Sequence, residues 1–360
     1  MTEIKVDTVT NAADNGAVDF PDGMTLEGTA FADVEGFTYS TTKPTDPVNG
    51  DIYWTGTDIY IWVVSQWRKI NLGTADTTPP TWYGDRGVEG GGQLSATKYN
   101  IIDYWDITTL GNATDFGDLT VARGYPAACS NGTYGVFGGG FSTARVDTID
   151  YITIATTGNA TDFGNLTVAR HDGGAASDST RGLFAGGDQS SGTDSTTDYI
   201  TIASTGNATD FGDLITAGRN HAGCSDGTYA LFSGSGSSTA IDYFTIQTTG
   251  NATDFGDITA ARNTPASSGD GTYGLWAGGY NNQNIIDRVT TATPGNATDF
   301  GDLTYGRWGC GGMHNATRMV ITAGYLKYYV DYVTMATAGN ATDFGDSTQN
   351  RYVAGTTSGA

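Results

Sequence analysis

Residues 111–117 read GNATDFG, and the same seven residues begin again five times further along the chain, at Gly158, Gly206, Gly250, Gly295 and Gly339. The intervals between successive copies are 47, 48, 44, 45 and 44 residues. An Arg follows each copy, at Arg123, Arg170, Arg219, Arg262, Arg307 and Arg351. An Asp in an apolar setting precedes each copy, at Asp103, Asp150, Asp198, Asp242, Asp287 and Asp331. Self-similarity at a period of this size indicates a repeat architecture.

One repeat contains the signals of four short strands. Read from Arg123, the predicted strands are 125–129, 133–139, 147–156 and 161–168, with the sequences YPAAC, TYGVFGG, DTIDYITIAT and TDFGNLTV. Asn131 and Gly132 stand between the first two, and Asn-Gly between apolar strands is a strong hairpin signal. Four strands in about 45 residues, repeated, predict the blades of a β-propeller.

The two ends of the repeat array complement each other. The first copy lacks an inner strand, and the last ten residues, RYVAGTTSGA, align with the inner strand RNHAGCSDGT that begins at Arg219. The C-terminal strand is therefore predicted to complete the first blade. The 276 residues from Asp85 to Ala360, divided by six, give 46 per blade. We expect an all-β protein with a six-bladed propeller over residues 84–360, whose closure removes the exposed edges of an open sheet.

The repeat resembles the kelch repeat over this range. The resemblance rests on the Arg-led inner strand, on double glycines such as Gly139 with Gly140 and Gly278 with Gly279, and on an aromatic outer strand. Phe116 and its five equivalents stand where kelch blades usually carry Trp, and the fourth repeat has Gly234 with Ser235 in place of the double glycine. The resemblance implies a kelch-like fold and leaves the function open.

The residues before the array differ in kind. Residues 1–35 have too little apolar mass for a monomeric core, so they are predicted to be an extended β segment for attachment and oligomerisation, most simply as a trimer. Residues 36–72 predict a small β-hairpin unit, and residues 73–83 a linker. KVDT, FPDGMTL, KPTDPVNGDIYW and WRKI make this region similar to the N-terminal parts of tailed-phage fibres and other virion appendages.

Charge and composition narrow the range of partners. The chain has 39 Asp plus Glu against 17 Lys plus Arg, a formal net charge of −22. This balance disfavours nucleic acid and anionic membranes as partners. The N-terminus lacks the features of a signal peptide, so synthesis in a host cytoplasm is expected. The three cysteines predict small buried thiols and no disulfide framework.

No motif predicts catalysis. DFG occurs six times as part of a turn and strand, and the chain has only His171, His221 and His314, at different repeat positions. Copper or zinc would need converging imidazoles or thiolates. We therefore predict no enzymatic activity and no cofactor. The repeated Arg and Asp residues are predicted to form structural pairs, and calcium among the DFGD turns stays open. The Asn of each GNATDFG is interpreted as a turn former that satisfies local backbone groups.

The loops that follow the double glycines vary, whereas the GNATDFG turns do not. These loops and the connections between blades belong to one rim, where exposed aromatic, Asn and Lys side chains can stack on sugar faces and hydrogen-bond hydroxyls. The alternative is drift in unconstrained loops. The predicted ligand-binding residues are Tyr280, Asn281, Asn282, Trp308, Tyr325, Lys327 and Tyr328.

Together these features predict a virion structural protein, a phage tail fibre or receptor-binding protein that recognises a host-surface glycan or protein non-covalently. The N-terminal segment would bind other virion proteins, on the tail or on the capsid surface. One alternative is a capsid-decorating or tail-collar protein that uses the propeller as a spacer. A third is a kelch-type carbohydrate-active enzyme.

Overall fold

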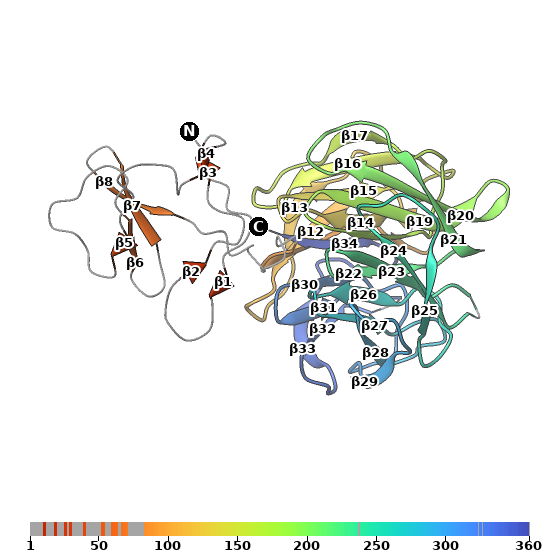
Figure 1. Ribbon diagram of the computed structural model, residues 1–360. Coiled ribbons are helices and arrows are strands. Elements are labelled where there is room, and N and C mark those ends of the chain that lie inside the picture. The colour runs from red at the N-terminus through yellow and green to blue at the C-terminus, as the bar shows by residue number, and fades with distance from the viewer. Residues whose placement is uncertain are drawn as a thin grey trace. The chain divides into compact units, whose positions relative to one another are not determined.

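The computed structural model describes residues 83–359, apart from Ser237, Ala323 and Leu326, together with the backbone of strands before residue 83. The chain divides into two compact units, Met1–Thr78 and Pro79–Ala360 (Figure 1). No helix long and apolar enough to cross a bilayer occurs among the described residues.

The first unit contains short strands. The predictions of an extended segment over 1–35, a hairpin unit over 36–72 and a linker over 73–83 concern residues that lie, apart from these strands, almost wholly outside the described part. Two-stranded sheets pair β1 (Thr10–Asn11) with β2 (Val18–Asp19), and β3 (Thr25–Leu26) with β4 (Thr29–Ala30). A four-stranded sheet has the order β5 (Tyr39–Ser40), β6 (Ile52–Trp54), β7 (Ile59–Val63) and β8 (Gln66–Ile70).

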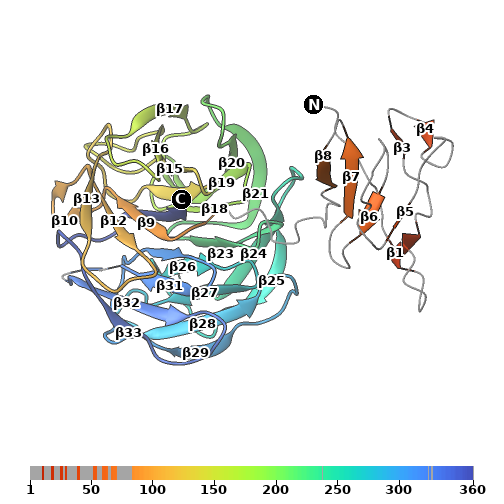
Figure 2. The same cartoon turned by 90° about the vertical axis from the view of Figure 1, so that its left-hand side faces the viewer.

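The second unit is a six-bladed β-propeller, and each blade is a four-stranded antiparallel sheet (Figure 2). Blade 1 holds β34 (Gly355–Gly359), β9 (Arg86–Gly90), β12 (Ile101–Asp106) and β13 (Thr114–Asp118). Blade 2 holds β14 (Ala127–Ser130), β15 (Tyr134–Gly138), β16 (Thr148–Thr153) and β17 (Thr161–Asn165). Blade 3 holds β18 (Gly174–Ser177), β19 (Arg181–Gln189), β20 (Gly192–Thr201) and β21 (Thr209–Gly218). Blade 4 holds β22 (Ala222–Ser225), β23 (Tyr229–Ser233), β24 (Ala240–Thr245) and β25 (Thr253–Asp257).

Blade 5 holds β26 (Ala266–Gly269), β27 (Tyr273–Ala277), β28 (Ile285–Thr290) and β29 (Thr298–Asp302). Blade 6 holds β30 (Gly312–His314), β31 (Arg318–Ile321), β32 (Tyr329–Thr334) and β33 (Thr342–Asp346). A small hairpin, β10 (Gln93–Leu94) with β11 (Thr97–Lys98), projects from blade 1. In Figure 2 the fourth strands, such as β13 and β33, lie on the circumference.

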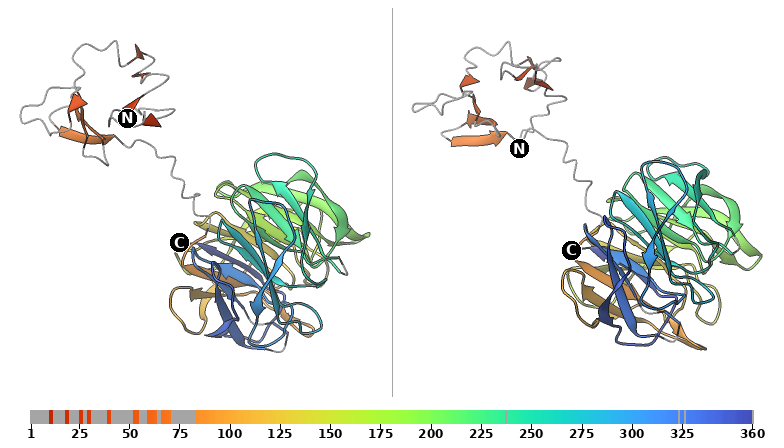
Figure 3. Two further views of the ribbon diagram at one scale, coloured as in Figure 1. Left: turned by 60° about the horizontal axis from the view of Figure 1, so that its bottom comes forward. Right: turned by 90° about the horizontal axis from the view of Figure 1, so that it is seen from below.

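The C-terminal strand closes the ring, as the sequence predicts. β34 pairs antiparallel with β9, with Gly355 opposite Gly90 and Gly359 opposite Arg86. The orange and dark blue ends of the propeller lie side by side in both views of Figure 3. Blade 1 therefore takes its inner strand from the opposite end of the array, and all six blades have four strands.

The apolar core lies between neighbouring blades. In blade 2, Asn131 and Gly132 form the turn between β14 and β15, and the buried Val136 and Phe137 of β15 follow it. Phe137 belongs to a cluster with Val88 and Ile102 of blade 1, so each sheet packs against the next. A Cβ atom on Gly90 would lie 2.7 Å from the Phe137 ring, which explains why a glycine ends the strand there.

Five of the six repeated Arg residues form the predicted structural pairs. Arg123 and Asp150, for example, are fully buried and lie 2.9 Å apart. A β-bulge precedes every one of these Asp residues, as between Ile149 and Asp150. Because the bulge re-aims the chain, two consecutive side chains are both buried and the carboxylate reaches the Arg. The remaining pairs join Arg170 to Asp198, Arg262 to Asp287, Arg307 to Asp331 and Arg351 to Asp103.

Arg219 departs from this prediction. It follows Gly206 by 13 positions, whereas each other Arg follows its GNATDFG copy by 12, so Gly218 takes the structural place of the Arg. A Cβ atom on Gly218 would lie 2.0 Å from the Ser235 Oγ, in the blade that lacks the double glycine. Arg219 is 54% exposed by side chain and approaches Asp188 at 3.5 Å. The structural counterpart of Arg351 is therefore Gly218, so the alignment of Arg351 with Arg219 is one residue out of register.

Each GNATDFG copy links its blade to the preceding blade by a hydrogen bond of its Asn side chain. The Asn159 Oδ1 accepts a hydrogen bond from the backbone N–H of Asp118 in the preceding blade, at 3.1 Å. The same bond recurs around the ring and closes between Asn112 and Asp346. The prediction that these Asn side chains serve local backbone groups was therefore wrong. Contact with a neighbouring blade constrains all six copies in the same way, which explains why they are alike. The other four bonds are those of Asn207, Asn251, Asn296 and Asn340.

Candidate binding site at the channel mouth

The inner strands surround a central channel whose mouth is a ring of left-handed residues. One residue from each connection between blades has a φ between +51° and +67°, and five of the six are not glycine. Left-handed backbone is unfavourable for β-branched side chains such as those of Thr264 and Val353. The six residues are Tyr125, Asp172, Asn220, Thr264, Gly309 and Val353.

Backbone hydrogen bonds between blades hold this ring together. The N–H of Tyr125 donates to the carbonyl of Val353 at 2.7 Å, and the N–H of Val353 donates to Gly309 at 2.7 Å. Asn220 donates to Asp172 in the same way. The backbone strain is therefore offset by inter-blade bonds, and strain of this kind is concentrated at functional sites.

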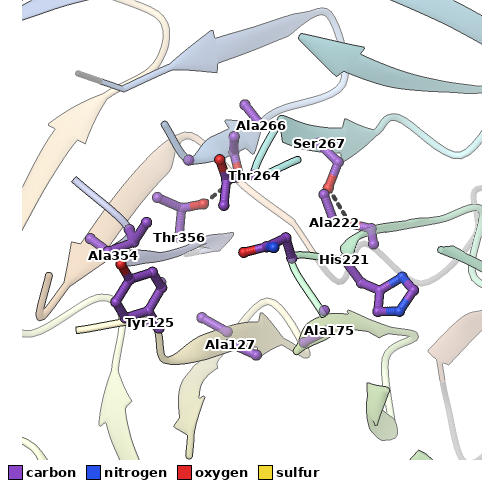
Figure 4. Close-up of a pocket in the computed structure, with 18 of the residues that line it drawn as sticks. Tyr125, Ala127, Ala175, His221, Ala222, Thr264, Ala266, Ser267, Ala354 and Thr356 are labelled. Atoms are coloured by element: carbon purple, nitrogen blue, oxygen red, sulfur yellow. Dashed lines mark hydrogen bonds between the residues drawn. The ribbon is translucent and has the colours of Figure 1, made fainter. Parts of the chain in front are cut away.

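The mouth itself is narrow and has small side chains. Its cavity volume is about 110 Å³, and Figure 4 shows Ala127, Ala175, Ala222 and Ala266 around it. The His221 ring turns away from the opening, into the region of Gly186 and Leu214. A cavity of this size admits water or a small group, so a larger ligand would bind across the mouth and its rim.

Aromatic side chains form a contact cluster beside the mouth, on the rim that carries the variable loops, which we call the loop rim. The rings of Trp308 and Tyr325 stack with centroids 4.8 Å apart and an interplanar angle of 18°. Tyr280 meets Trp308 edge-on at 5.6 Å, and Tyr352 lies 5.0 Å from Trp308. These four residues are the rim aromatic cluster. Tyr280 is 51% exposed and Tyr325 36% exposed, so the cluster offers flat apolar surface to solvent.

A buried glutamine connects this cluster to the mouth. The Gln93 Nε2 donates to the hydroxyl oxygens of Tyr352 and Tyr125, each at 3.0 Å. Its Oε1 accepts a hydrogen bond from the Lys98 Nζ. Burial, with the Asp172 carboxylate as the second cause, raises the pKa of Tyr125, which stays a neutral phenol. Hydrogen bonds thus fix the orientation of two tyrosines at the edge of the opening.

The aromatic surface continues beyond Tyr125 to a polar corner. The His171 ring lies 5.5 Å from that of Tyr125 and 5.3 Å from that of Phe141. Its Nδ1 is 2.9 Å from the Asp172 carboxylate. Arg145 pairs with Asp188 at 3.0 Å beside it. The loop rim can therefore bind by stacking in blades 5 and 6 and by charged hydrogen bonds in blades 2 and 3.

The structure divides the seven predicted binding residues into two groups. Tyr280, Trp308 and Tyr325 belong to the rim aromatic cluster, with Asn281 and Asn282 exposed beside Tyr280 in left-handed conformation. The other two, Lys327 and Tyr328, lie instead at a separate groove, with Tyr329, Ser347 and Asn112. Tyr325 and Lys327 are only two positions apart in the chain, yet they belong to different groups.

Two residues of the rim were missed by the sequence prediction. Tyr352 follows Arg351 as Trp308 follows Arg307, so the repeat alignment places both at one structural position and could have identified it. Gln93 had no such signal, since the residue after the double glycine varies among the repeats and no other copy has Gln there.

The remaining titratable groups of interest are buried histidines and cysteines. Burial lowers the pKa of His221 to about 4 and that of His314 to about 3. The three cysteines are buried free thiols, as predicted, and burial raises the pKa of Cys129 to about 12. Among the described residues, no group of three or more His, Cys, Asp or Glu side chains is placed to hold a metal ion.

Comparison with known proteins adds no family assignment. No protein-family model matches the chain, and no curated protein matches it.

Proposed function

We propose that this protein is a virion appendage, a tail fibre or related receptor-binding protein of a tailed phage, whose loop rim binds a host-surface glycan or protein non-covalently. The observation that carries the proposal is the rim aromatic cluster. Stacked Trp308 and Tyr325 present apolar ring faces that can bury a sugar face, and neighbouring amides and hydroxyls can bond its hydroxyl groups.

The point at which the chain enters the propeller supports this proposal. The described chain enters the propeller at Tyr83, whose ring lies 4.7 Å from that of His314 at the end of β30. This is the rim opposite the variable loops. The loop rim is thus the other rim of the propeller, and it is the one that we propose to contact a receptor. We further propose that residues 1–72 bind other virion proteins and form a trimer.

The net charge favours one class of receptor. At −22, the protein repels anionic polymers unless cations bridge them. A neutral or cation-bridged glycan is therefore the preferred ligand. The channel mouth, at about 110 Å³, is too small to enclose a large ligand, so the glycan would lie across the rim.

Replacing Trp308 and Tyr325 by Ala tests this function. Loss of an aromatic anchor commonly costs more than about 1 kcal/mol, roughly five-fold in affinity, so the double variant should lose most adsorption to host cells. Adsorption is measured by depletion of the fluorescently labelled protein from a cell suspension.

Leu110→Ala is the matched control, because Leu110 is 54% exposed and lies in the turn between β12 and β13 on the opposite rim. It should leave adsorption unchanged. Normal adsorption by the double variant, with its melting temperature preserved, would favour a capsid or collar protein that uses the propeller as a spacer.

A further inference from the structure

A groove on the outer wall of blade 6 is separate from the rim aromatic cluster. It lies where the first GNATDFG copy pairs with β33, since Gly111 donates to the carbonyl of Phe344 and Ala113 to that of Asp346. Its volume is about 520 Å³, within the range of roughly 300–1,000 Å³ typical of small-molecule sites. Its lining residues are Asn112, Lys327, Tyr328, Tyr329, Asp346 and Ser347.

Ser347 makes this wall groove different from the equivalent region of every other blade. The position after the DFGD or DFGN turn is Leu or Ile in the other five copies, and those side chains are buried in the core. Ser347 is also buried, at 7% exposure, and its Oγ has no hydrogen-bond partner. A buried hydroxyl without a partner costs free energy, so a water or polar ligand group that reached the Ser347 Oγ from the groove would lower that cost.

The chemistry around Ser347 suits an uncharged ring with hydroxyl groups. Tyr328 is 49% exposed, and the stacked pair of Tyr305 and Tyr329, with centroids 5.3 Å apart, adds further aromatic surface. Lys327 and Asp346 contribute one positive and one negative charge, so the lining has no net formal charge. Ring faces that stack and a balanced set of donors and acceptors favour a neutral sugar over an ion.

We propose that the wall groove is a second carbohydrate site, which binds a further unit of the same neutral glycan chain whose first unit stacks on the rim aromatic cluster. The inference rests on the proposed function. Tyr325 belongs to the rim and Tyr328 to the groove, and three residues of chain span at most about 11 Å. The ligand class is therefore an oligosaccharide chain, read at two neighbouring sites, and not a single terminal sugar.

Full-length protein on a printed array of neutral bacterial surface oligosaccharides, from one to six sugar units, tests this inference. Two variants act on the groove: Ser347→Leu, which introduces the residue of the other blades and removes the hydroxyl, and Tyr328→Ala on the surface. Each should weaken binding at least five-fold for chains of three or more units and leave single sugars unaffected. Trp308→Ala should weaken binding at every length. Ile215→Ala, at a residue that is 55% exposed in β21 of blade 3, should weaken it at none.

The outcomes separate the two proposals. If both groove variants bind all lengths as the wild type does while Trp308→Ala binds weakly, the second site is wrong and the proposed function stands. If Ser347→Leu does not fold, the same criterion applies to Tyr328→Ala alone. If the wild type binds no sugar and does not adsorb to cells, the proposed function fails and the second site fails with it.

Discussion

At the scale of single residues, the repeated Arg is buried in one copy and exposed in another, as Arg307 and Arg219 show. Arg307 is fully buried, and its Nη1 lies 2.9 Å from the Asp331 Oδ2 while Nη2 donates to the carbonyl of Ile321. Arg219 is exposed, and its ion pair is with Asp188. Exposed ion pairs contribute about 0–1 kcal/mol to stability. Removing one partner of a buried pair leaves an uncompensated charge, which costs about 3–5 kcal/mol.

Arg307→Met should therefore lower the free energy of unfolding by about 3–5 kcal/mol, measured by urea denaturation at pH 7. Arg219→Met is its matched control and should change that free energy by no more than about 0.5 kcal/mol. Equal losses in the two variants would show that burial of the guanidinium is not what gives the repeated Arg its role.

At the scale of elements, β9 of blade 1 carries a buried acidic side chain at a position that is aromatic in the next two blades. Glu89 of β9 stands where β15 and β19 carry Phe137 and Phe184. Arg351 serves two buried carboxylates there, 3.2 Å from that of Glu89 and 3.0 Å from that of Asp103. Burial, the largest cause, raises the pKa of both carboxyl groups in spite of Arg351.

Glu89→Gln should stabilise the protein at pH 8 and reduce its dependence on pH. Because the pKa of Glu89 is raised in the folded state, the folded protein binds the proton more readily than the unfolded chain does. Wild-type stability should therefore rise as the pH falls from 8 through that raised pKa toward the ordinary value of 4.5, by up to about 1.4 kcal/mol per pH unit. The Glu89→Gln variant has no carboxyl group at this position, so it loses this part of the pH dependence. Arg351 still has a buried partner in the variant, because it also pairs with Asp103. Urea denaturation at pH 8 and pH 5 measures both slopes, and identical slopes would contradict the assignment.

The repeat made most of the elements predictable, because a residue that recurs at one position in six copies has one structural role. This reasoning yields the blades, the closing strand and the buried Arg–Asp pairs. It fails at Gly218, where one extra residue shifts the register and hides the change from an alignment anchored on Arg219. It also fails for Lys327 and Tyr328, since the path of a loop outside the repeat decides which surface its side chains reach.

At the scale of the whole molecule, the propeller has what a monomer needs. Its ring is closed by β34, and its apolar clusters lie between its own blades. The hydrogen bond from the Asp346 N–H to the Asn112 Oδ1 joins the last blade to the first. A net charge of −22 adds repulsion between copies of the chain. The propeller alone therefore gives no physical reason for self-association.

A chain that begins at Pro79, the start of the second compact unit, should accordingly be a folded monomer, while the full chain should be a trimer. Residues 1–35 have little apolar mass, so association of three copies would supply the shared core that one copy lacks. Light scattering coupled to gel filtration measures both masses, and circular dichroism checks that the shorter chain is folded. A trimeric short chain would place the oligomer contact in the propeller. If both chains were monomers, self-association through residues 1–72 would be wrong, and only the proposed attachment to another virion protein would remain for that segment.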